Sequence, residues 1–236
     1  MMSLLYEPIF YLLLVSPILL LGKKKEAWEA IYLALFAAYF ILDFIMVSLP
    51  FTVEAVQFVQ GEMNWEGKIF SYALAILFLL FYRRLPWSEY GLQFQQRAGS
   101  LGFGWRSVGI VAVIFTIYGY LIGGYSGGAE NIAFQFTMPS IVEEIAYRGI
   151  LLGLLNQVFP RNWKLGKAYI GWGVVITSVL FGLLHGLSID ANFAITCNWP
   201  PIILTGVIGF ILGWVRERTD SLVFPIILHI LINTIP

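Results

Sequence analysis

The chain has 236 residues, of which 59% are hydrophobic and 12% are charged, and its formal net charge is zero. Soluble domains are about 45–50% apolar and about 25% charged, so this composition excludes a soluble domain and predicts an integral, multi-pass membrane protein. The basic residues lie mainly at the ends of apolar runs and leave no basic face for a nucleic acid. The single cysteine, Cys197, excludes an intramolecular disulfide and a cysteine-based metal site.

Apolar runs divide the chain into candidate membrane spans, each of which needs about 20 mostly apolar residues. Glycine, proline and charged clusters separate eight such runs, at residues 4–22, 27–50, 68–82, 101–124, 131–158, 169–188, 200–215 and 221–235. The prediction is an all-α, polytopic membrane helix bundle of about eight transmembrane helices embedded in the lipid bilayer. Glycine pairs four residues apart in four of these runs predict close contacts between helices.

The loops between the predicted spans alternate in charge. Basic residues occur in every second loop, at 23–25, 83–97, 161–167 and 216–218, and the loops between them are acidic and hold no basic residue. The positive-inside rule predicts that the basic loops face the cytoplasm and that both termini lie on the other side. Within the second basic loop, residues 85–99 mix aromatic and polar side chains, which indicates a stretch lying at the membrane surface.

Three charges interrupt the fifth predicted span, in the stretch PSIVEEIAYRGILLG. An ionisable side chain at the bilayer centre costs about 2.5–3.5 kcal/mol, so Glu143, Glu144 and Arg148 must face the protein interior and find partners. Glu144 and Arg148 lie four residues apart on one helix face, which predicts an ion pair. A structural role alone would explain that pair, but a single arginine does not neutralise Glu143 as well.

The two histidines of the chain lie in later spans. His185 ends the stretch FGLLH, and His229 begins HILIN, in which Asn233 follows one helical turn later. His185 lies near the end of its predicted span, so either the span continues beyond 188, or the site is displaced outward, or the following loop folds back. A buried histidine is more often a hydrogen-bonded core residue than a functional one, but both histidines of this chain accompany buried carboxylates.

These residues, from three spans, support more than one kind of site. A glutamate and a histidine can activate water while a second histidine and an asparagine donate hydrogen bonds to an oxyanion. Glu143, His185 and His229 could instead hold zinc. Alternatively, buried Glu, Arg and His side chains mark an ion- or proton-coupled transporter, in which Asp43 of the second span would be a further relay group. The chain has no internal repeat of the kind that many transporters show.

Three motifs in order resemble those of a known family. EEIAYR (143–148), FGLLH (181–185) and HILIN (229–233) fill the patterns E-E-x-x-x-R, F-x-x-x-H and H-x-x-x-N of the CAAX-protease and bacteriocin-processing (CPBP) family of intramembrane endopeptidases. That family includes the type II CAAX prenyl endopeptidases. The resemblance covers roughly residues 136–236 and divides the chain into N-terminal spans with a linker (1–100) and a catalytic core (101–236).

The resemblance implies a role for each matching residue. Glu143 with His185 would polarise the attacking water, Glu144 would support the site and pair with Arg148, and His229 with Asn233 would stabilise the oxyanion. It implies a membrane-associated peptide or protein as the substrate, prenylated or not, and either no cofactor or a zinc ion. The expected location is the plasma membrane or the inner membrane of a bacterium or an organelle, and the sequence sets no oligomeric state.

Overall fold

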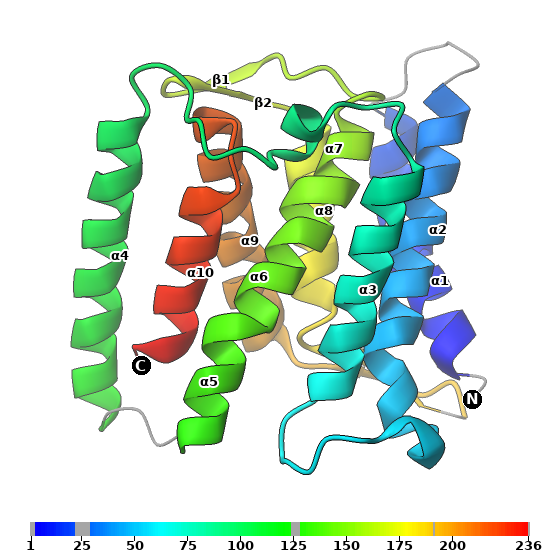
Figure 1. Ribbon diagram of the computed structural model, residues 1–236. Helices are drawn as coiled ribbons and strands as arrows, with labels where there is room; N and C mark the ends of the chain where they lie inside the picture. The colour runs from blue at the N-terminus through cyan, green and yellow to red at the C-terminus, as the bar shows by residue number, and fades with distance from the viewer. Residues whose placement is uncertain (1–2, 22–28, 124–127, 191, 236) are drawn as a thin grey trace.

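The computed structural model describes residues 3–21, 29–123, 128–190 and 192–235, and these residues form a bundle of helices (Figure 1). Its long helices are α1 (Ser3–Leu21), α2 (Glu29–Ser48), α3 (Trp65–Phe81), α4 (Leu101–Ile122), α8 (Trp172–Leu183), α9 (Trp199–Thr219) and α10 (Val223–Thr234). The fifth predicted span contains four consecutive pieces, α5 (Ala129–Thr137), α6 (Pro139–Glu143), the π-helix η4 (Glu144–Leu151) and α7 (Leu152–Leu155). Short 3₁₀-helices η1 (Leu49–Phe51), η2 (Glu54–Val56) and η3 (Trp87–Tyr90) lie in the connections.

Each predicted span therefore coincides with a helix or with a run of helices. Among the described residues, three helices are long and apolar enough to cross a membrane by themselves, at Glu29–Phe51, Leu101–Leu121 and Trp199–Thr219. The others are shorter, so the number of transmembrane helices stays a prediction. Residues 22, 27–28 and 124, at the ends of three predicted spans, and the basic residues 23–25 lie outside the described residues.

Helix α4 lies at the edge of the bundle and exposes a long apolar face. Ile110, Val113 and Ile117 are each more than half exposed, and only 6% of its most apolar stretch is buried. In water such a continuous apolar face would be an aggregation site, whereas a lipid bilayer solvates it. This exposure agrees with the integral membrane protein that the composition predicts.

The prediction of an all-α chain misses two small antiparallel sheets. Strand β1 (Trp163–Leu165) pairs with β2 (Ala168–Ile170), and β3 (Leu187–Ile189) pairs with β4 (Ile195–Cys197). Strand β2 lies at the start and β3 at the end of the predicted span 169–188, whose helix covers only Trp172–Leu183. Backbone groups that leave a helix must find new hydrogen-bond partners, and pairing in a hairpin supplies them.

The fifth predicted span is not the single helix that its apolar length indicates. Pro139 has no backbone N–H and separates α5 from α6, while the Ser140 hydroxyl donates to the Gln135 carbonyl oxygen at 2.7 Å. The π-helix then begins at Glu144. Such wide turns are rare and occur frequently at functional sites.

The main core joins the first hundred residues to the rest of the chain. Val15 of α1 and Phe36 and Phe40 of α2 are buried in one cluster with Leu151 of η4 and Leu180 of α8. Because one core draws on both 1–100 and 101–236, the N-terminal helices support the segment that holds the sequence motifs.

Helices α8 and α9 approach each other closely at a glycine, as the four-residue glycine spacing predicts. A Cβ atom on Gly182 would lie 2.5 Å from the Ile202 carbonyl oxygen and 3.1 Å from the Gly206 Cα, so no larger residue fits there. The same prediction is wrong at the end of α4. A Cβ atom on Gly123 would meet none of the described residues within 4 Å beyond its chain neighbours, and Gly123 instead adopts a positive φ of 94° that ends the helix.

The linker of residues 85–100 crosses one end of the bundle and is tied to the turn between α9 and α10 (Figure 1). Arg97 forms two contacts of 2.6 Å with the Asp220 carboxylate, and Arg218 donates to the Gly99 carbonyl oxygen at 2.8 Å. Arg216 also donates to the Glu89 carbonyl oxygen, and the ring of Tyr90 is fully buried. The linker is thus part of the packed structure as well as a surface stretch.

The two ends of the bundle differ in charge. The basic segments 83–97, 161–167 and 216–218 lie at the end shown at the top of Figure 1, which we call the basic end. The segments 51–64 and 187–197 lie at the opposite end, which we call the acidic end. The alternation of the loops is therefore present in the fold, and the side of the membrane that each end faces stays a prediction.

Candidate active site

Four of the six residues singled out by the motifs line one cavity. Glu143 at the end of α6, His185 in the turn after α8, and His229 and Asn233 of α10 surround a space of about 580 Å³. The topology brings these three regions together although they lie far apart in the sequence. Polar side chains around such a cavity provide a place for water inside an apolar bundle.

This cavity lies toward the acidic end of the bundle. Its lining includes Val47 at the end of α2, Asn64 immediately before α3, and Leu204 near the start of α9. Helix α8 ends before His185, whose side chain is exposed. Of the three explanations for the position of His185, a span that continues beyond 188 is wrong, because α8 ends at Leu183. The position of the cavity agrees with a displaced site, and the following segment also turns back as hairpin β3–β4.

Glu144 and Arg148 lie behind the cavity and do not line it. The guanidinium Nη1 of Arg148 donates to Glu144 Oε1 at 2.9 Å, and both side chains are buried. The predicted ion pair is thus confirmed. The same carboxylate oxygen lies 2.8 Å from Nδ1 of His229. A carboxylate in an ion pair only accepts hydrogen bonds, so Nδ1 carries a proton and Nε2 is the ring atom left to face Glu143 Oε2, at 3.9 Å.

The ring of His185 is oriented by the backbone. Its Nδ1 lies 2.6 Å from the carbonyl oxygen of Phe181, one helical turn earlier. A carbonyl oxygen can only accept, so Nδ1 carries the proton and Nε2 of the neutral ring is free to accept from water or from another group. The F-x-x-x-H spacing therefore places the His185 ring next to the Phe181 carbonyl oxygen, and this contact selects the tautomer with the proton on Nδ1.

Phe181 has a second role that the sequence did not reveal. Its ring centroid lies 4.2 Å from the guanidinium carbon of Arg148 and 4.6 Å from the ring centroid of His185. Cations are attracted to the face of an aromatic ring, so the ring offsets part of the cost of burying Arg148. Gly209 leaves room for this arrangement, since a Cβ there would lie 3.0 Å from Arg148 Nη2.

Two partners of the site come from outside the motifs, and sequence reasoning missed both. Asn233 donates from its side-chain amide to Gln135 Oε1 of α5 at 3.1 Å, which leaves the second amide hydrogen free. Lys68 in the first turn of α3 places its Nζ 2.6 Å from Glu143 Oε1. One signal was present: Lys68 is a basic residue next to a loop, 51–67, that otherwise holds only acidic charges.

The side chains do not fit the predicted zinc site as they lie. Among the described residues no three His, Cys, Asp or Glu side chains gather closely enough to ligate a metal ion. Within the predicted set, the Lys68 ammonium group already contacts Glu143 Oε1, and the nearest approach of His229 Nε2 to that carboxylate is 3.9 Å, to Oε2. No step of the hydrolysis is therefore assigned to a metal ion.

Carboxylate and imidazole groups facing one cavity inside a helix bundle are typical of membrane hydrolases that activate water, and also of proton carriers. Comparison with known families distinguishes these classes. The family model described as type II CAAX prenyl endopeptidase Rce1-like matches residues 125–235, which include all six motif residues. Residues 125–235, just under half of the chain, are therefore similar to the Rce1-like type II CAAX prenyl endopeptidases, and this similarity indicates a membrane protease.

The matching model describes the CAAX endopeptidases, and the bacteriocin-processing part of the predicted family stays a prediction. No match was found among curated proteins or among solved structures. None of these comparisons supports the transporter alternative.

Proposed function

We propose that this protein is an intramembrane endopeptidase in which Glu143 is the general base. The observation that carries the proposal is that Glu143 and both histidines line one cavity within the segment that matches the protease family. The substrate is a membrane-associated peptide or protein, because the cavity lies inside a bundle whose outer surface is apolar.

In the proposed reaction the water molecule lies between Glu143 and His185. Glu143 takes a proton from this water while the water oxygen attacks the peptide carbonyl carbon. His185 Nε2 accepts a hydrogen bond from the other hydrogen of the water. The carbonyl oxygen becomes an oxyanion that receives hydrogen bonds from the Asn233 amide and from His229 Nε2. In this role the His229 ring is protonated on both nitrogens, with Nδ1–H held by Glu144. Glu143 then returns its proton to the leaving amine.

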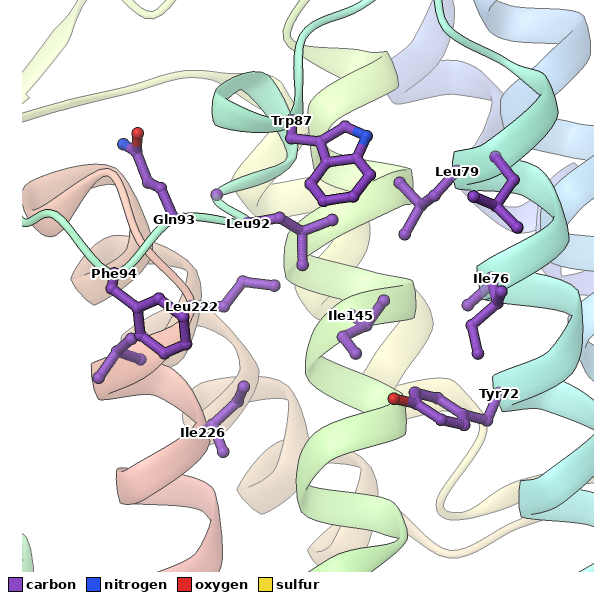
Figure 2. A pocket seen from close by; sticks show the side chains of 14 residues that line it. Tyr72, Ile76, Leu79, Trp87, Leu92, Gln93, Phe94, Ile145, Leu222 and Ile226 are labelled. Atoms are coloured by element: carbon purple, nitrogen blue, oxygen red, sulfur yellow. The ribbon is translucent and has the colours of Figure 1, made fainter.

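An apolar groove of about 380 Å³ supports a substrate that carries a lipid tail (Figure 2). Figure 2 shows Ile76 of α3 on one side, Leu222 and Ile226 on the other, Ile145 of η4 between them, and Trp87 of the linker above. Apolar side chains at such a groove favour an alkyl or isoprenoid chain over a peptide backbone, which would leave its polar groups without partners.

The groove follows the same helix faces as the cavity. Ile76 lies two helical turns after Lys68 on α3, and His229 and Asn233 lie three and seven residues after Ile226 on α10. A chain attached next to the scissile bond would therefore extend from Glu143 toward the basic end. We propose a prenyl group, or another apolar chain of similar width, as its occupant.

The proposed function is tested first with the purified, detergent-solubilised protein and synthetic peptides with and without a prenylated cysteine. We expect cleavage by the wild type and a decrease in kcat/KM of about 10²–10³-fold in His185→Leu, because an apolar side chain cannot replace the ring Nε2 as an acceptor toward water. Both proteins are assayed with and without a zinc chelator. Cleavage that survives the chelator supports the glutamate mechanism, and activity restored only by zinc contradicts it. Equal cleavage by both proteins would assign the activity to a contaminant.

The groove is tested by filling it. Ile76→Trp is expected to raise KM for a prenylated peptide by about 10-fold, since a mismatch in an apolar pocket costs about 1–3 kcal/mol, while an unprenylated peptide is cut as before. Leu77→Trp is the matched control, because Leu77 is the adjacent, half-exposed residue on α3 and does not line the groove. Equal effects of Ile76→Trp on both peptides, or equal effects of the two variants, would contradict a tail-binding groove.

A further inference from the structure

Lys68 lies outside the matched segment and outside every motif, yet it makes the shortest contact of Glu143. Its Nζ lies 2.6 Å from Glu143 Oε1, and the two side chains are only 13% and 15% exposed. Lys68 also lines the 580 Å³ cavity with His185 and His229. A cation that contacts the proposed base and faces the same space is placed to act on the reaction through that base.

A second, smaller cavity surrounds the other side of Lys68. This space of about 210 Å³ is lined by Asp43 of α2, Tyr147 of η4, and again by Glu143 and His185. Asp43 is buried and accepts a hydrogen bond from the Ser71 hydroxyl. The titratable groups that face Lys68 are therefore Asp43, Glu143, Tyr147 and His185, with His229 beyond Glu143.

The charges of the two glutamates are matched one to one. Arg148 contacts Glu144, and Lys68 contacts Glu143. Since a carboxylate away from bulk water requires a nearby positive charge, the second cation explains how two adjacent glutamates can lie in one apolar helix.

The contact also distinguishes the two oxygens of Glu143. Lys68 occupies Oε1, whereas Oε2 is directed toward His229 Nε2, at 3.9 Å. An ammonium group on one oxygen restricts rotation of the carboxylate and leaves the other oxygen for the reacting proton. A misplacement of about 1 Å in such a group can lower a rate by about 10²-fold.

We propose that Lys68 is a positioning residue for the general base: it supplies the counter-charge of Glu143 and directs Oε2 into the cavity. This inference rests on the proposed function, in which Glu143 is the base. It adds to the site a residue from α3, more than 50 positions before the matched segment begins. The role requires a positive charge at this place and not merely a side chain of this length.

The kinetic experiment compares Lys68→Met with Lys68→Arg. Lys68→Met is expected to lower kcat by about 10–100-fold with little change in KM, and to move the acidic limb of the pH–rate profile to higher pH. Lys68→Arg keeps the charge and is expected to restore the profile and part of kcat. Lys167→Met, which removes an exposed lysine at the basic end, is the matched control and should behave as the wild type. A Lys68→Met variant with the wild-type profile and kcat would overturn the inference.

A spectroscopic measurement separates this inference from the proposed function. Infrared spectra at neutral pH are expected to show a protonated-carboxyl band in Lys68→Met that is weaker in the wild type and is lost in Lys68→Met/Glu143→Gln. Because Asp43 also faces Lys68, the three proteins are compared in an Asp43→Asn background, so that the band is assigned to Glu143. If the band behaves in this way and no peptide is cut, Lys68 holds the charge of Glu143 and the proposed protease function fails. If peptides are cut and no difference in the band is found, the function stands and the role of Lys68 is wrong.

Discussion

Glu143→Gln is expected to lower kcat/KM by ~10³-fold, within the range that a positioned general base contributes. The amide has nearly the size of the carboxylate and can still accept a hydrogen bond from Lys68, but it cannot take a proton from water. The cavity and the fold should therefore persist while the reaction is lost. Peptide cleavage measures the loss of the reaction. Thermal unfolding curves of the variant and the wild type measure whether the fold persists.

Glu54→Gln is the control for this substitution. Glu54 lies in η2 at the acidic end, where its side chain is exposed. The same chemical change there alters the charge at the acidic end of the bundle without touching the site, so kcat/KM should stay near the wild-type value. Full activity in Glu143→Gln would remove Glu143 from the role of base.

Breaking the buried ion pair is expected to have the largest effect on stability. Glu144→Leu leaves Arg148 buried without its partner, and loss of one member of such a pair costs about 3–5 kcal/mol. Replacing both residues, in Glu144→Leu/Arg148→Met, removes the unpaired charge and should recover most of that stability. Activity should not return, because His229 Nδ1 has lost the carboxylate that orients the ring. Thermal unfolding in detergent and peptide cleavage measure the two effects separately.

Asp220→Asn provides the comparison for a pair at the surface. Asp220 and Arg97 are about a third exposed, and exposed pairs contribute about 0–1 kcal/mol. Asp220 has a positive φ of 57°, a conformation that asparagine also tolerates, so the substitution tests the charge alone.

If the double variant at Glu144 and Arg148 regained full activity, the pair would be a structural element and would not orient the site.

The sequence predicts those features that depend on neighbours along the chain. The Glu144–Arg148 pair follows from four-residue spacing on a helix, and apolar runs of helical length locate the spans. His229 and Asn233 lie one helical turn apart, and both line the cavity that Glu143 also lines. These features need no knowledge of how the helices are arranged.

The features that the sequence misses depend on contacts across the bundle or on backbone geometry within a span. The contact between Lys68 and Glu143 joins residues 75 positions apart, and the bond between Asn233 and Gln135 joins residues 98 apart. No local pattern specifies either contact. The break at Pro139 and the π-helix after it were likewise hidden, because an apolar run has the same composition whether its helix is regular or interrupted.

The position of Lys68 in the first turn of α3 has a consequence for how the protein is made. Synthesis proceeds from the N-terminus, so α3 exists before Glu143 has left the ribosome. Until then the lysine can extend its long side chain to the water at the membrane surface, as lysines near helix ends do. Arrival of α6 then replaces water by a carboxylate. The nascent N-terminal helices therefore need no catalytic partner to enter the membrane, and the later segment that carries Glu143 completes the charge balance of α3.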